Sequence, residues 1–128
     1  MKQNLKILVG VDGSDNSTWA LMEAISIAKK FSGHIKVITV YKQGKKDEAT
    51  KTQTKIKQLL DEEQIDSNLS AILGSNPARA LVDTAENEKI DLIVVGSRGL
   101  GNAASFILGS VSKKVVSKAS CNVLVIKK

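Results

Sequence analysis

Cysteine, proline, arginine and aromatic residues are all scarce in this chain of 128 residues. The single cysteine excludes a disulfide-stapled scaffold and a metal site built from several thiolates. Aromatic residues make up only 3% of the sequence, too few for a platform on which single-stranded bases stack. Arg79 and Arg98 are the only arginines among 19 basic residues, so the positive charge is mostly lysine, which recognises anions less specifically than arginine does.

Long apolar runs and leader-like features are also missing. No stretch approaches the roughly 20 apolar residues that a membrane-spanning helix needs, and the first residues do not resemble a secretory signal. These absences predict a cytoplasmic protein without a membrane partner. The net charge of +6 favours anionic partners, but the shortage of arginine and aromatic residues argues against nucleic acid as the main one.

The chain does contain a regular alternation of short apolar runs and amphipathic stretches. Strands are predicted at residues 6–11, 35–40, 67–73, 91–95 and 122–126. Helices are predicted between them, at residues 14–31, 47–63, 77–85 and 110–117. Most of the strand runs are uninterrupted, which is typical of parallel strands buried on both faces. The sequence therefore predicts one α/β domain over residues 1–128, an open, doubly wound parallel sheet with helices on both faces.

In such a sheet, ligands bind beyond the carboxyl ends of the strands, where the strand order reverses. After the fourth predicted strand the sequence has the spacing Gly96-x2-Gly99-x9-Gly109-Ser110. Glycines let backbone amides approach an anion closely, and the free N–H groups at a helix start favour phosphate. Arg98 adds a charged donor, and Ser110 and Ser112 add hydroxyl donors. This pattern predicts a polyphosphate cradle; a surface loop whose glycines only turn corners is the alternative.

The glycine spacing resembles the ATP-binding signature of the universal stress protein family, the UspA-like group, at every fixed position. The similarity also covers residues 7–14, 91–99 and 121–126, so it spans both ends and the last third of the chain. It implies a five-stranded parallel sheet in the order 3-2-1-4-5, a Rossmann-like fold of the adenine nucleotide alpha hydrolase type. It also implies membership of the subgroup that binds ATP or AMP, with or without Mg²⁺.

The resemblance assigns roles to individual residues. The triphosphate and ribose would be surrounded by Gly96, Arg98, Gly99, Gly109, Ser110, Val111 and Ser112. Asp12, just past the first strand, would hold the ribose or a phosphate-bound Mg²⁺, although aspartate followed by glycine is also typical of a plain turn. The backbone of Val40 would contact the adenine edge. The segment between Tyr41 and Asp47 is shorter than in many relatives, which would leave the nucleotide less covered.

The function implied by the resemblance is a nucleotide-dependent regulator of the stress response, with little or slow ATP hydrolysis. An ATP-hydrolysing or phosphoryl-transferring enzyme on the same fold is the alternative, but the sequence offers no GxxxxGK[ST] loop and no histidine in the cradle. His34 is interpreted as a surface histidine and Cys121 as a partly buried thiol. Because relatives typically dimerise through the last strand, a homodimer is predicted, together with protein partners that the sequence does not identify.

Overall fold

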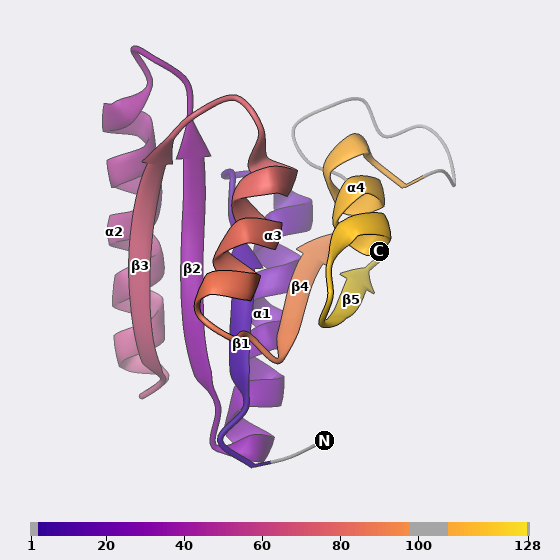
Figure 1. Cartoon of the computed structure of the whole chain (residues 1–128). Helices are drawn as coiled ribbons and strands as arrows, with labels where there is room; N and C mark the ends of the chain where they lie inside the picture. The colour runs from indigo at the N-terminus through magenta and orange to yellow at the C-terminus, as the bar shows by residue number, and fades with distance from the viewer. Residues whose placement is uncertain (1–2, 98–107, 128) are drawn as a thin grey trace.

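The computed structural model of this protein describes residues 3–97 and 108–127, so the predicted site residues Arg98 and Gly99 lie outside the described residues. The described residues form five strands and four helices in the predicted order (Figure 1). The strands are β1 (Lys6–Gly10), β2 (His34–Tyr41), β3 (Asp66–Leu73), β4 (Leu92–Gly96) and β5 (Asn122–Ile126). The helices are α1 (Asp15–Phe31), α2 (Lys46–Glu62), α3 (Pro77–Asn87) and α4 (Ser110–Lys118).

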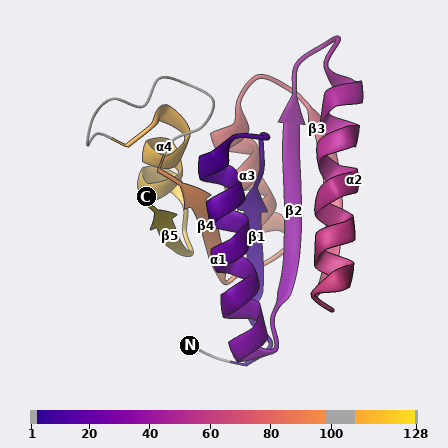
Figure 2. The same cartoon turned by 180° about the vertical axis from the view of Figure 1, so that it is seen from behind.

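The five strands form one parallel sheet in the order β3-β2-β1-β4-β5, which confirms the predicted architecture. Helices α1 and α2 cover one face of the sheet, and α3 and α4 cover the other (Figures 1 and 2). The chain moves outward from β1 to β3 and then returns past β1 to β4. The strand order therefore reverses between β1 and β4, and a ligand site is expected at the carboxyl ends of these two strands.

Each face of the sheet buries its own apolar cluster, and β1 contributes to both. Ile7 and Val9 pack with α1 and α2, whereas Leu8 points to the opposite face and packs with α3 and α4. All three side chains are 0% exposed. Successive side chains of β1 point to opposite faces of the sheet, and both faces are buried, so every one of these side chains must be apolar. This is why the strand has the uninterrupted apolar sequence from which it was predicted.

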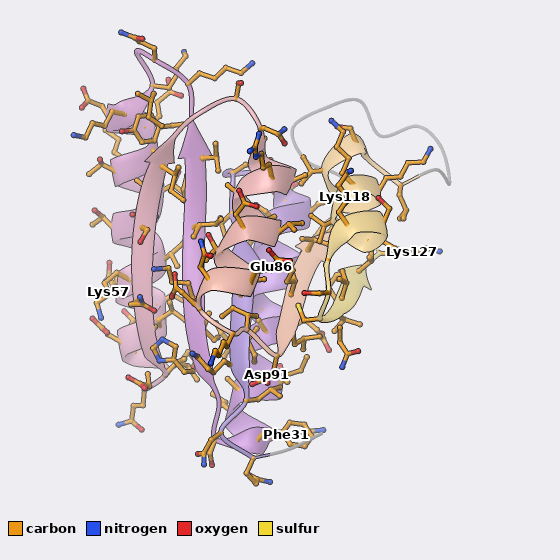
Figure 3. All side chains as sticks on the ribbon, in the orientation of Figure 1. Phe31, Lys57, Glu86, Asp91, Lys118 and Lys127 are labelled. Carbon is orange, nitrogen blue, oxygen red and sulfur yellow. The ribbon has the colours of Figure 1, made fainter. Side chains whose placement is uncertain are left out.

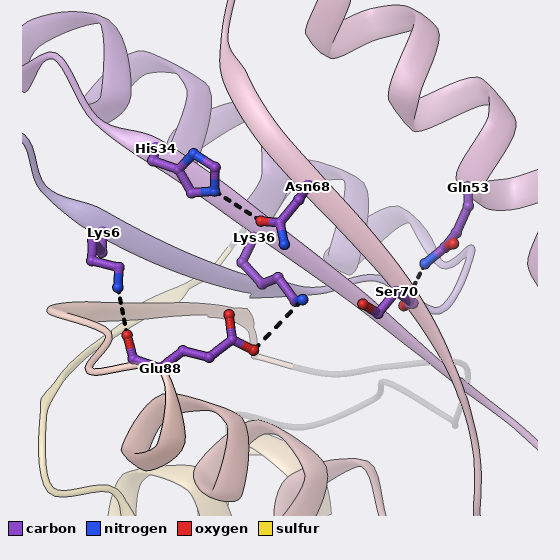
Figure 4. A network of polar contacts seen from close by, with 7 residues as sticks. All are labelled: Lys6, His34, Lys36, Gln53, Asn68, Ser70 and Glu88. Atoms are coloured by element: carbon purple, nitrogen blue, oxygen red, sulfur yellow. Dashed lines mark hydrogen bonds and ion pairs between the residues drawn. The ribbon is translucent and has the colours of Figure 1, made fainter.

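Polar side chains join the amino ends of β2 and β3, at the edge of the sheet opposite the expected site (Figure 4). The imidazole of His34 lies 3.0 Å from the Asp66 carboxylate and 2.8 Å from the Asn68 side-chain oxygen. The buried ammonium group of Lys36 lies 3.6 Å from the Glu88 carboxylate. The contacts with Asp66 and Asn68 give His34 a structural role between β2 and β3.

The described residues include no helix long and apolar enough to span a membrane. They also include no group of three or more side chains placed to bind a metal ion.

Candidate functional site

The first turn of α1 packs against the end of β4. Gly96 is the last residue of β4, where it pairs with Ile126. A Cβ atom on Gly96 would lie 2.6 Å from the carbonyl oxygen of Asn16 and 2.8 Å from its carbonyl carbon. The glycine is therefore required by helix–strand packing, whatever it contributes to a ligand. The backbone of Asn16, in the first turn of α1, thus lies against the end of β4. Nothing in the sequence around Asn16 indicates this contact.

Asp12 lies in the exposed turn between β1 and α1 and stabilises that turn. Its Oδ1 accepts a hydrogen bond from the Ser14 N–H at 2.9 Å, and Gly13 between them has a φ of +88°. Ser14 then caps α1, because its Oγ accepts a hydrogen bond from the Ser17 N–H at 3.2 Å. Within the described part of the chain, Oδ2 of Asp12 has no hydrogen-bond partner. One carboxylate oxygen thus makes the turn, and the other can accept hydrogen bonds or bind a cation.

Hydrogen bonds around Ser97 join the end of β4 to the start of α4. The Ser97 carbonyl accepts hydrogen bonds from the Gly109 N–H at 2.6 Å and from the Ser112 hydroxyl at 3.0 Å. The Ser97 N–H donates to the carbonyl of Ile126 at 2.8 Å, and the Ser97 hydroxyl lies 3.3 Å from the side-chain oxygen of Asn16. Ser112 is only 2% exposed. Its hydroxyl proton is used inside the protein, so Ser112 offers a ligand its backbone N–H and not its side chain.

Helix α4 begins without a side-chain cap. Its N-cap residue is Gly109, and the first backbone hydrogen bond of the helix runs from the Lys113 N–H to the Gly109 carbonyl at 3.0 Å. The N–H groups of residues 110–112 therefore have no acceptor within the helix. By contrast, α1 and α3 are capped by the side chains of Ser14 and Asn76. The first turn of α4 also contains no acidic residue, so its positively polarised end favours an anion.

Beyond the end of β1, the backbone of β2 has an unpaired edge. The Val11 N–H donates to the Ile38 carbonyl at 3.0 Å, so Ile38 directs its backbone groups toward β1. The Gly74 N–H donates to the Tyr41 carbonyl at 2.9 Å, on the other side of β2. Because the direction alternates along a strand, the N–H and C=O of Val40 point toward β1, which has already ended. No described residue pairs with them, so this end of β2 offers one backbone donor and one backbone acceptor side by side.

Cys121 lies immediately before β5, at the amino ends of the strands and so away from these groups. It is half-buried, which confirms the interpretation from the sequence. Burial is the main reason why the pKa of its thiol is raised above the ordinary value. A raised pKa keeps the thiol protonated at neutral pH, and therefore poorly nucleophilic.

We expect Ser112→Ala to lower the free energy of unfolding by about 1–2 kcal/mol, because it removes a buried hydroxyl and leaves the Ser97 carbonyl with one donor fewer. Urea denaturation followed by circular dichroism measures the change. Ser110→Ala is the matched control, since Ser110 is an exposed serine two residues earlier in the same helix, and its effect should stay within about 0.5 kcal/mol. Equal effects of the two substitutions would contradict the structural role of the Ser112 hydroxyl.

The fold and this site define a doubly wound α/β protein in which a helix without a side-chain cap begins at the point where the strand order reverses. The sequence model of the Universal stress protein family matches residues 4–127, and the chain belongs to that family. The universal stress protein MJ0531 of Methanocaldococcus jannaschii is 34% identical over 140 aligned residues, which cover 96% of this chain and 82% of that protein.

Solved structures of the family agree with this fold over nearly the whole chain. The universal stress protein UspA from Lactobacillus plantarum is 26% identical, with a TM-score of 0.87 over 98% of this chain and 99% of that one. A universal stress protein in complex with cAMP is 29% identical, with a TM-score of 0.78 over 98% of each chain.

Proposed function

We propose that the protein binds ATP or AMP at the carboxyl ends of β1 and β4 and acts as a nucleotide-dependent regulator of the stress response. The observation that carries this proposal is the start of α4, which has no side-chain cap and no acidic residue in its first turn, and which Ser97 and Ser112 hold beside the end of β4. The relative in complex with cAMP supports an adenine nucleotide as the ligand.

The groups at this edge of the sheet fit the parts of a nucleotide. The N–H groups of residues 110–112 would bind phosphate, and the backbone of Val40 would bind the adenine edge. The second carboxylate oxygen of Asp12 would bind the ribose or a phosphate-bound Mg²⁺. From their place in the glycine signature, we also assign Gly96, Arg98 and Gly99 to the surroundings of the phosphates.

We propose that hydrolysis of bound ATP is slow or absent. Rapid phosphoryl transfer needs a group that positions the attacking nucleophile and groups that stabilise the developing charge. His34, the only histidine of the chain, lies at the amino end of β2, at the opposite edge of the sheet. Asp12 has one of its carboxylate oxygens committed to its own turn. The regulator is therefore preferred over an ATP-consuming enzyme.

We further propose that the protein acts in the cytoplasm, where ATP is available, as a homodimer joined through β5. Among the residues 3–97 and 108–127, this strand pairs only with β4, and none of them pairs with the backbone groups of its other edge. Its four apolar residues, 123–126, are all half-buried, and covering them by a second copy would remove apolar surface from water. Light scattering tests the dimer, and a monomer at micromolar concentration would refute it.

Calorimetric titration with ATP and AMP, each with and without Mg²⁺, tests the proposed function when it is combined with an assay for released phosphate. Saturable binding with negligible phosphate release is the expected result. Rapid release would favour the enzyme, and the absence of binding by any adenine nucleotide would refute both functions.

We expect Asp12→Asn to weaken the Mg²⁺-dependent part of ATP binding about tenfold, because a carboxylate attracts Mg²⁺ and a neutral amide does not. The amide oxygen can still accept the hydrogen bond from the Ser14 N–H, so the turn and the fold should persist. Without Mg²⁺, the variant should bind ATP at least as tightly as the wild type, because one negative charge near the phosphates is gone. Calorimetry with and without Mg²⁺ measures both effects.

Asp15→Asn is the control for this prediction, because Asp15 is an exposed acid in the first turn of the same helix. It should leave the Mg²⁺ dependence unchanged. If Asp12→Asn showed the wild-type Mg²⁺ dependence as well, Asp12 would be a turn residue only.

A further inference from the structure

A groove of about 420 Å³ lies between α3 and α4, outside the groups assigned to the nucleotide. The two helices pack side by side on the same face of the sheet (Figure 1). The lining residues are Asn76, Ala78, Arg79, Val82, Asp83, Lys114 and Lys118. None of them belongs to the glycine signature.

The lining residues form one stripe on each helix. On α3 they recur at spacings of three and four from Asn76 to Asp83, which places them along one face over about two turns, or roughly 10 Å. On α4 they are Lys114 and Lys118, one turn apart. The α3 stripe includes the buried Ala78 and the half-buried Val82. The groove therefore combines apolar contacts on one helix with two ammonium groups on the other.

The charges of the two stripes are not balanced. On α3, the Arg79 guanidinium lies 3.5 Å from the Asp83 carboxylate, so these charges offset each other. Lys114 and Lys118 form no ion pair with any residue that the structure describes, and α4 contains no acidic residue. Lys118 lies on the α4 side of the groove (Figure 3). Two exposed lysines one turn apart thus leave one wall of the groove with unpaired positive charge.

We propose that this groove is a docking surface for a segment of a partner protein that carries both acidic and apolar side chains. Carboxylates of the partner would pair with Lys114 and Lys118, and its apolar side chains would cover the half-buried Val82. The length of the α3 stripe suits about two turns of a helix, with acidic and apolar residues repeating three and four positions apart.

The lining of the groove favours such a segment over nucleic acid. Phosphate backbones are bound by clusters of basic residues, and bases in single strands stack on aromatic side chains. None of the described residues that line the groove is aromatic, and Asp83 places a carboxylate beside the one arginine among them. The half-buried Val82 is of no use to a phosphate backbone but would contact the apolar side chains of a peptide.

A fluorescence anisotropy titration tests the proposal with a labelled peptide of about three helical turns, built from glutamate and leucine at helical spacing. A peptide of the same pattern with lysine in place of glutamate is the probe for charge. The wild-type protein should bind the acidic peptide and not the basic one. The double substitution Lys114→Glu and Lys118→Glu should weaken binding about tenfold or more, because it converts two attractions into repulsions.

Lys51→Glu combined with Lys55→Glu is the matched control, because these two lysines are also exposed and one turn apart, on α2. This control makes the same change in net charge away from the groove and should alter the affinity less than twofold. Val82→Asn, which removes an apolar contact without changing the charge, should weaken binding about threefold. Circular dichroism checks that each variant is folded, and Lys114→Gln with Lys118→Gln replaces the glutamate variant if that one is not.

Three outcomes would overturn the proposal. They are no binding of the acidic peptide by the wild type, equal weakening by the groove and control double variants, and tighter binding of a single-stranded oligonucleotide than of the peptide. None of these measurements needs ATP, so failure here would not bear on the proposed nucleotide site.

Discussion

Gly109→Asp is expected to abolish ATP binding while leaving the protein at least as stable as the wild type. Residue 109 is the N-cap of α4, with a φ of −63° that aspartate readily adopts. An aspartate there would accept hydrogen bonds from the helix N–H groups that we assign to phosphate. As an N-cap residue, aspartate would also stabilise the helix by roughly a few tenths of a kcal/mol relative to glycine. It would also place a negative charge within a few ångströms of the phosphates, which costs several kcal/mol, on the order of 4.

The affinity for ATP should therefore fall at least about a hundredfold, as measured by calorimetry, while the urea midpoint stays the same or rises. Gly109→Asn separates the two causes, since asparagine caps the helix as aspartate does but carries no charge. It should lose affinity too, but less than the aspartate variant loses. ATP affinity that is unchanged in a folded Gly109→Asp variant would show that the phosphates bind elsewhere.

The fold could be predicted because its signals are local. Ile7, Leu8 and Val9 are apolar on both faces of one strand, and this pattern recurs in three of the other four strands at intervals filled by helices. Such an alternation permits few topologies other than a doubly wound parallel sheet. The order of the strands came from the family resemblance, and the structure confirms it.

The site could be predicted only in outline, because the use of each group depends on segments far apart in the chain. The glycine spacing indicated a phosphate cradle, but Gly96 is required first by the carbonyl group of Asn16, a residue 80 positions earlier. Ser112 was predicted as a hydroxyl donor to phosphate, whereas its proton is donated to the Ser97 carbonyl. The groove between α3 and α4 was missed for the same reason, since the lysines of α4 show no pattern until α3 packs beside them.

Gly96→Ala is expected to lower the free energy of unfolding by about 2–3 kcal/mol, because overpacking against atoms that cannot move away is destabilising. The new Cβ would lie 2.6 Å from the backbone oxygen of Asn16 and 2.8 Å from the backbone carbon. Relief would require the first turn of α1 to shift as a whole, together with the turn that contains Asp12. ATP affinity should therefore fall along with stability. Urea denaturation and calorimetry measure the two effects.

Gly74→Ala is the control for this prediction. A Cβ at residue 74 would have Val40 Cγ1 as its nearest neighbour, at 3.8 Å, which is an ordinary contact. This substitution should leave the free energy of unfolding unchanged or raise it by up to about 1 kcal/mol, because alanine lowers the conformational entropy of the unfolded chain. If Gly96 served only to let a phosphate approach, Gly96→Ala would lose affinity and keep its full stability. Loss of both is expected, because α1 already occupies the space beside Gly96 before any ligand arrives.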